Sequence, residues 1–96
     1  MTTDVTLLVL LSLSSGPKHG HAIQDDVARE TAVRLGPGSL YGAISRLESE
    51  GLISPLESEG RRRPYQITEL GRTALREKTE ALQTLVSLAR SRLVSP

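Results

Sequence analysis

The pattern of apolar and polar residues predicts two helices in the first third of the chain. Residues 4–14 are apolar nearly all round, which predicts a buried helix that ends at the breaker residues Ser15–Pro17. Ile23 and Val27 then lie four residues apart among polar neighbours, which predicts an amphipathic helix over about 18–31. The next residues, 31–35, carry β-branched side chains in a loose alternation that also fits a short strand.

A third helix is predicted over about 37–50. Its buried stripe is spaced i, i+4 and i+7 and consists of Leu40, Ile44 and Leu47. Gly36 suits the N-cap, Pro37 suits the first helical position, and Gly51 suits a left-handed C-terminal cap. Together with the helix before it, this helix forms the outline of a helix-turn-helix.

A β-hairpin is expected after the third helix. Residues 52–58 and 64–68 are the predicted strands, and the polar residues 59–63 form the turn between them. Pro55 restricts the first strand to an edge position, because proline cannot donate a ladder hydrogen bond.

One long helix is expected from the N-cap residue Thr68 to about Leu93, spanning about 38 Å at 1.5 Å per residue. Its apolar seam steps by four and three residues through Leu75, Thr79, Leu82, Val86, Ala89 and Leu93, broadened by Leu85 and Leu88. The seam is too short for an independent coiled coil and needs a partner surface. We interpret Leu75, Leu82, Leu85, Val86, Ala89 and Leu93 as a dimerisation surface; in the alternative, the helix folds back on its own domain.

The predicted fold is therefore mainly α with a small β-hairpin. It corresponds to a winged helix-turn-helix domain over 4–68 followed by a C-terminal dimerisation helix over 69–93. The chain of 96 residues and 10.4 kDa allows one such domain with an appended element.

Composition excludes several classes of function. The chain contains no cysteine, which rules out disulfide frameworks, zinc fingers, iron–sulfur sites and thiol catalysis. Aromatic residues make up only 2%, which argues against a base-stacking platform. The apolar run 5–13 follows Asp4 and lacks a cleavage site, so we expect a buried helix and a cytoplasmic protein.

Charge is divided between the two parts of the chain, although the formal net charge is only +1. Residues 1–59 carry four basic and eight acidic side chains, whereas residues 60–96 carry eight basic and three acidic ones. A local basic surface attracts a polyanion even when the whole chain is nearly balanced. The overall charge therefore neither establishes nor excludes nucleic acid as a partner.

The residues expected to contact DNA lie in three places. Those in the first turns of the third helix are Ser39, Tyr41, Gly42, Ser45 and Arg46, and those at the hairpin tip are Arg61, Arg62 and Arg63. Lys18 and His19 are further candidates, at the expected start of the second helix. In the alternative reading, Arg46 pairs with Glu50, the hairpin arginines are neutralised by Glu57 and Glu59, and Lys18 and His19 form an ordinary exposed helix start.

Catalytic and metal sites are not indicated. The sequence from Gly36 to Gly42 nearly spells G-x-G-x-x-G, but Tyr41 occupies the third glycine position and no buried strand precedes it. His19 and His21 are two residues apart and cannot share a helix face, so no metal ion is expected. No nucleophile motif or carboxylate pair with a companion base is present, and we expect neither an enzyme nor a cofactor.

Three segments also resemble the PadR family of bacterial transcriptional regulators. They are LLVLLSLSSGPKHGHAI (7–23), LGPGSLYGAISRLESEGLI (35–53) and RRRPYQITELGRTAL (61–75), and the resemblance covers roughly residues 5–75. It implies that the third helix is the recognition helix, that Arg61–Arg63 form the wing tip, and that the last helix is the dimer contact. The length is similar to that of the family's shorter branch.

The sequence departs from the family pattern in places. His21 and Gly42 stand where the family has tyrosine and proline, and Pro64 precedes Tyr65 in the wing. Members of the short branch that bind flat drugs between subunits use a tryptophan of the last helix, and this sequence has none.

We therefore expect a homodimeric repressor that binds double-stranded DNA at an inverted repeat. A small-molecule effector at the dimer interface is a second hypothesis, either with DNA binding or as a ligand sensor without it. The third is a winged-helix module that binds only protein. No membrane association is expected.

Overall fold

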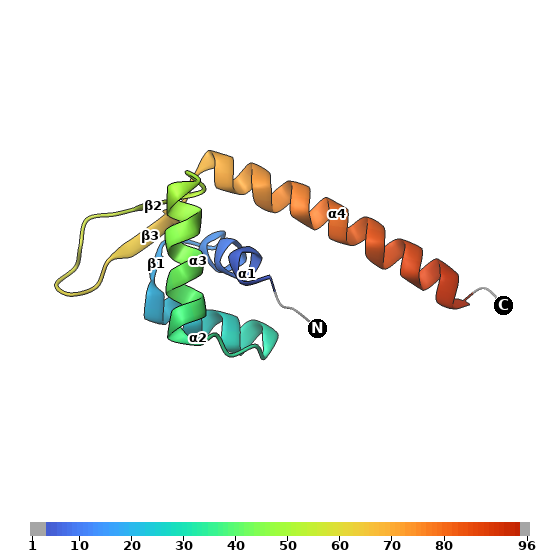
Figure 1. Ribbon diagram of the computed structural model, residues 1–96, viewed down its shortest axis with the longest axis horizontal. Coiled ribbons are helices and arrows are strands. Elements are labelled where there is room, and N and C mark those ends of the chain that lie inside the picture. Colours follow the sequence, from blue (N-terminus) through green and yellow to red (C-terminus); the bar gives the residue numbers. More distant parts are fainter. Residues whose placement is uncertain (1–3, 95–96) are drawn as a thin grey trace.

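The computed structural model describes residues 4–94. Three short helices and a small sheet form one body, and a long helix extends away from it (Figure 1). In chain order, the elements are α1 (Val5–Leu13), β1 (Lys18–His19), α2 (Gly20–Thr31), α3 (Pro37–Ser49), β2 (Ile53–Pro55), β3 (Pro64–Ile67) and α4 (Glu69–Val94). This arrangement is the winged helix-turn-helix with a long C-terminal helix that the sequence predicts.

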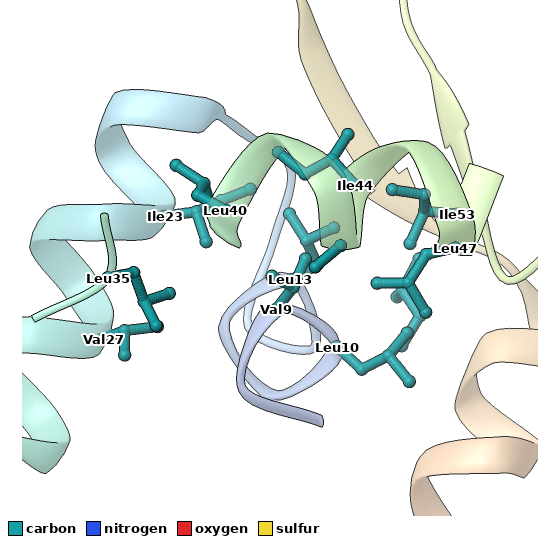
Figure 2. Packing of buried hydrophobic residues seen from close by; sticks show 12 residues of the cluster. Val9, Leu10, Leu13, Ile23, Val27, Leu35, Leu40, Ile44, Leu47 and Ile53 are labelled. Carbon is teal, nitrogen blue, oxygen red and sulfur yellow. The ribbon is translucent and has the colours of Figure 1, made fainter. Parts of the chain in front are cut away.

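The core lies where α1, α2 and α3 meet. Aliphatic side chains of the three helices point into the same space, joined by Ile53 of β2 and Ile67 of β3 (Figure 2). The periodic residues Ile23, Val27 and Leu40 are among those buried, as their spacing predicts. The core is aliphatic, and no buried side-chain polar atom within 4–94 lacks a hydrogen-bond partner, so burial of this surface carries no cost from unsatisfied polar groups.

The helix ends follow from local sequence. Asp4 caps α1 by accepting a hydrogen bond from the Leu7 amide, and Thr68 caps α4 by accepting one from the Gly71 amide. Pro37 occupies the first turn of α3. Gly51, just beyond the end of α3, has a φ of 77°, a left-handed conformation that favours glycine.

The sheet has three antiparallel strands in the order β1–β3–β2, rather than the two expected. Lys18 pairs with Tyr65 and His19 with Pro64, so these residues form an edge strand instead of starting the second helix, which begins at Gly20. The segment 31–35 was expected as a possible strand; it forms the end of α2 and an irregular connection. Ala32 follows the last residue of α2 and has a left-handed conformation, with a φ of 60°, which ends the helix and turns the chain into this connection.

The wing is formed by β2, β3 and the loop between them. The regular strands are shorter than predicted: β2 spans Ile53–Pro55 and β3 spans Pro64–Ile67, and the residues between them form a longer loop than expected. Pro55 lies on an edge strand, as expected. Figure 1 shows the loop projecting from the body on the side opposite to α4.

The long helix α4 does not fold back on its own domain. Residues 76–94 are exposed along their whole length, and the molecule extends over 59 Å in its longest direction. Leu75 differs from the rest of the predicted seam, because it packs partly against the core of its own chain. Within residues 4–94, no helix is long and apolar enough to cross a membrane.

Candidate nucleic-acid interface

The outward face of α3 is smooth and polar. Leu40, Ala43, Ile44 and Leu47 turn inward, which leaves an exposed ridge of the small residues Gly38, Gly42, Ser45 and Ser49. Small side chains allow the helix backbone to come close to a surface such as the floor of a groove. The other predicted contact residues of α3, namely Ser39, Tyr41 and Arg46, flank this ridge and are also exposed.

Arg46 is paired with Glu50, as the alternative reading of the sequence proposed. Its Nε donates to Oε1 of Glu50 at 3.0 Å, one helical turn further along α3. Because this bond uses only Nε, both terminal nitrogens of the guanidinium remain available to a guanine edge or a phosphate. The pairing therefore orients Arg46 without occupying its recognition edge.

Tyr41 connects α3 to the start of α2. Its ring and hydroxyl lie so close to Gly20 that a Cβ on residue 20 would be only 2.5 Å from the hydroxyl oxygen. Gly20 is buried beneath this ring, while Tyr41 itself keeps 51% of its surface exposed. The phenol thus lies at the junction between the two helices and remains accessible to a ligand.

The wing arginines lie beside this junction. A cavity of about 220 Å³ is lined by Arg61, Arg62, Arg63, Tyr41, Tyr65, His19, Gly20 and His21. The tertiary structure therefore brings the two predicted groups together: the wing tip borders the same hollow as Tyr41 and the N-terminus of α2. Backbone amides at that helix end add partial positive charge to the arginines.

The wing arginines form no ion pair with a carboxylate of residues 4–94. The ion pairs formed by residues 4–94 involve other arginines, histidine and lysine, and none includes Arg61, Arg62 or Arg63. Glu59 meets Arg62 through the backbone, where the two residues exchange hydrogen bonds of 2.8 and 3.0 Å across the turn. Three adjacent positive charges without carboxylate partners form a suitable surface for a polyanion.

His19 and Lys18 have different positions in this arrangement. His19 caps α2, since its Nδ1 accepts a bond from the Ala22 amide at 3.3 Å, and its ring borders the cavity. With Nδ1 accepting, the neutral ring carries its proton on Nε2, which can donate to a phosphate. The Lys18 ammonium instead donates to the Ser12 carbonyl at 2.5 Å and to the Ser15 hydroxyl at 2.8 Å. Lys18 thus stabilises the C-terminal end of α1.

Three lining residues were not predicted from sequence. Tyr65 belongs to β3 of the wing itself, and Gly20 and His21 are brought beside the wing by β1–β3 pairing, which a two-residue strand does not reveal in the sequence. Gln24 and Asp26 are polar neighbours of the apolar stripe of α2, yet both are partly buried: Gln24 donates to the Leu35 carbonyl, and Asp26 accepts from the Ser12 hydroxyl. Both contacts hold α2 in place beneath the interface.

The apolar face of α4 is the second uncovered surface. Leu82, Leu85 and Val86 keep 43–61% of their surface exposed, and Leu88, Ala89, Leu93 and Val94 are exposed as well. Neighbouring apolar residues in water indicate an interaction surface.

Among residues 4–94, no group of three His, Cys, Asp or Glu side chains is arranged to hold a metal ion.

The chain is similar in sequence to known transcriptional regulators. The model of the family described as "Transcriptional regulator PadR-like family" matches residues 8–77. "Transcriptional regulator Rv3488" of Mycobacterium tuberculosis is 36% identical over 84 residues, which cover 84% of this chain and 78% of that protein.

Two further similarities agree with this match. An uncharacterised 37.1 kDa protein in transposon TN4556 of Streptomyces fradiae is 45% identical over 84 residues; they cover 88% of this chain but only 24% of that protein. The chain therefore spans about a quarter of the length of that relative. The crystal structure of a PadR family transcriptional regulator from Eggerthella lenta superposes with a TM-score of 0.80 at 29% identity, covering 93% of this chain and 83% of that one.

Proposed function

Since this chain belongs to the PadR-like family of transcriptional regulators, which are DNA-binding regulators, we propose that it binds an inverted-repeat operator as a homodimer and represses transcription. Residues 4–68 would form the DNA-binding domain and residues 69–93 the dimerisation helix. A compact dimer that occupies a promoter needs no separate activation surface, and this favours repression over activation.

The observation that carries the proposal is the shared hollow between the wing and the two helices. Tyr41, His19 and the unpaired arginines of the wing border one cavity, immediately beside the small-residue ridge of α3. Such a surface can place α3 in a major groove while the wing contacts the flanking backbone or minor groove. We assign phosphate contacts to Arg61, Arg62, Arg63 and His19, and groove contacts to Ser39, Tyr41, Gly42, Ser45 and Arg46.

Lys18 is left out of this interface. Its three hydrogen bonds, one to Ser12 in the last turn of α1 and two to the loop that follows, would have to break before it reached a phosphate. We propose a structural role for it instead.

Dimerisation would cover the exposed apolar face of α4. Leu82, Leu85, Val86, Ala89 and Leu93 provide the contact, and Leu75 remains with its own domain. Residues 81–89 carry no charge, so this stretch can pack against a second copy without burying an ionised side chain. In the dimer, the two copies of α3 would lie about one helical turn apart, roughly 34–36 Å.

A small-molecule effector at the dimer interface is the second candidate. The leucine-rich face of α4 favours an apolar ligand, whereas the absence of tryptophan removes the aromatic sandwich of the family's drug-binding members. A protein-only module is disfavoured by the unpaired wing arginines. A cytoplasmic location follows from the proposed function, because a repressor must reach the DNA that it regulates.

Fluorescence anisotropy with the duplex upstream of the protein's own gene, against a scrambled duplex, tests the function. We expect preference for the upstream duplex, with log affinity falling against log salt at a slope of about −5 to −9, which corresponds to roughly 6–10 phosphate contacts. Equal, weak binding to both duplexes would move the search to other promoters. No binding at low salt would overturn the proposal in favour of the protein-only module.

A further inference from the structure

The helix α4 is attached to the DNA-binding domain over a short stretch at its beginning. Gly71 is buried against the backbone of the wing, where an added Cβ would lie 2.1 Å from the Leu52 carbonyl oxygen. One turn later, Leu75 packs partly against the core. At the next turn, Lys78 forms an ion pair with Asp4 of α1, with Nζ 2.8 Å from Oδ2. From residue 79 onward, every described side chain of α4 is exposed. Figure 1 shows this part of the helix extending away from the other elements.

The region between these attachments is not closely packed. A cavity of about 170 Å³ separates α4 from α1 and α3. Its apolar lining is Leu7, Leu10, Leu47, Leu52 and Ala74, and its polar lining is Asp4, Thr6, Arg46, Glu50 and Lys78. Side chains that do not fill the space between two elements do not fix the angle between them. The angle of α4 therefore depends on the few groups that bridge the cavity.

Asp4 is held in a fixed position at the α1 end of its ion pair with Lys78. Its Oδ1 accepts from the Thr6 hydroxyl at 2.7 Å and from the Leu7 amide at 3.1 Å, so the carboxylate is fixed at the N-terminus of α1. The Lys78 ammonium and the Thr6 hydroxyl lower the pKa of Asp4 from 3.8 to about 2, so this carboxylate keeps its charge further into the acid range than an ordinary aspartate. Oδ2 is left to Lys78 alone among the described contacts.

We infer that the Asp4–Lys78 ion pair sets the angle at which α4 leaves the domain, and thereby the spacing of the two operator half-sites. This inference rests on the proposed function, because spacing has meaning only for a dimer on DNA. Lys78 and Asp4 are then positioning residues that determine specificity without touching the duplex.

Lever geometry makes this pair sensitive. Measured along α4 from Gly71, Lys78 lies about 10 Å away and Leu85, at the middle of the proposed dimer surface, about 21 Å away. A displacement at Lys78 is therefore roughly doubled at Leu85. A shift of about 1.7 Å at the ion pair becomes about 3.4 Å at the dimer contact, which is the rise of one base pair.

The test is selection of bound duplexes from a random pool by the full-length protein and its variants. Lys78→Met removes the ion pair, Lys78→Arg restores a charged partner, and Arg76→Met makes the same charge change at a neighbouring residue for which the described structure shows no ion pair. We expect all four proteins to select the same half-site sequence. Wild type, Lys78→Arg and Arg76→Met should share one half-site spacing.

The expected effect of Lys78→Met is a broadened or displaced spacing. The wild type should prefer its own spacing over one base pair more or less by about ten-fold or higher, which is comparable to the loss of affinity caused by one mismatched base pair. In Lys78→Met this preference should fall below about three-fold. An unchanged spacing profile in Lys78→Met overturns the inference while leaving the proposed function intact. Failure of the wild type to select any repeated half-site overturns the proposed function itself.

A second variant tests the same joint without removing a charge. Ala74 is partly buried and lines the cavity, so Ala74→Leu fills part of the space between α4 and the helices below. We expect it to tilt α4 and displace the preferred spacing, with helix content by circular dichroism unchanged. If Ala74→Leu and Lys78→Met both retain the wild-type spacing, the angle of α4 is not set at this joint.

Discussion

The ring of Tyr41 in α3 lies against the bare Cα of Gly20, the first residue of α2. A methyl group on residue 20 would stand 2.5 Å from the phenolic oxygen and 2.8 Å from two ring carbons. The contact leaves no room for any other residue while Tyr41 keeps this position. It also places the hydroxyl beside the wing arginines.

Gly20→Ala is expected to weaken DNA binding more than stability. The far end of Tyr41 can rotate away at small cost, so unfolding free energy should change by less than about 1 kcal/mol, while the displaced phenol leaves the interface. Duplex affinity measured by anisotropy should fall several-fold. In a Tyr41→Ala background the same glycine substitution should have little further effect, and additive losses would show that the two residues act separately.

Gly71→Ala is expected to destabilise the fold. The added Cβ would meet the Leu52 carbonyl oxygen at 2.1 Å and the Ile67 Cγ1 at 2.7 Å, and a backbone atom cannot move aside as a side chain can. Overpacking of this kind costs about 1–3 kcal/mol, measurable by urea unfolding. Gly42→Ala is the matched control, because nothing lies within 4 Å of its added Cβ. Its gain in helix propensity should leave stability equal or higher by about 1 kcal/mol.

Arg62→Ala and Arg63→Ala should weaken binding to all duplexes alike. In the proposed homodimer each substitution removes two phosphate contacts, one from each subunit, so the slope of log affinity against log salt should become less steep by about 2. Arg46→Ala is the contrasting variant: its free terminal nitrogens lie on α3, so we expect relaxed preference at one base pair of each half-site. Wing variants that bind with an unchanged salt slope would contradict the proposed wing contacts.

Leu85→Asp is expected to dissociate the dimer. Leu85 is 61% exposed in the single chain, so a charge there costs little in the folded monomer and much in a buried contact. Sedimentation equilibrium should give a mass near 10.4 kDa for the variant and about twice that for the wild type. Glu80→Ala, on the same helix outside the uncharged stretch, should stay dimeric. A dimeric Leu85→Asp protein would place the contact elsewhere.

The Asp4–Lys78 pair predicts a specific acid dependence of stability. The folded-state pKa of Asp4, about 2, lies below its ordinary value of 3.8. The pair's contribution to stability is therefore fully present above pH 3.8 and is lost as the pH falls through about 2. Asp4→Asn keeps the helix cap but removes the charge, since asparagine is an equally good cap. The stability difference between wild type and Asp4→Asn should shrink between pH 4 and 2, and a constant difference would exclude the assignment.

Much of the fold follows from local signals in the sequence. The spacing of Leu40, Ile44 and Leu47, the cap at Thr68 and the breakers around Gly16 act within one or two turns. The first, third and last helices form where these signals predict them. The edge position of Pro55 is likewise a local consequence of a missing backbone donor. The resemblance to PadR regulators rests on the same segments, and the family match confirms it.

The strand β1 was beyond such reasoning. Two residues have no periodicity of their own, and Lys18 and His19 become a strand only because β3 offers them a partner. That pairing moves His19 to the wing cavity and turns the ammonium of Lys18 toward the carbonyls after α1. A basic residue near a helix start therefore has a structural task that its sequence position does not reveal.

The sequence by itself determined which segments are helical, which face of each is apolar, and that a basic wing precedes a long helix with an unpartnered seam. These properties depend on neighbours a few residues apart along the chain. Only the tertiary structure decided that Tyr41 lies over Gly20, that the wing arginines share a cavity with α2, and that Asp4 holds Lys78 across an unfilled joint. Such contacts join residues from 21 positions apart, for Gly20 and Tyr41, to 74 positions apart, for Asp4 and Lys78. At these separations the packing of whole elements, rather than local spacing, determines which side chains meet.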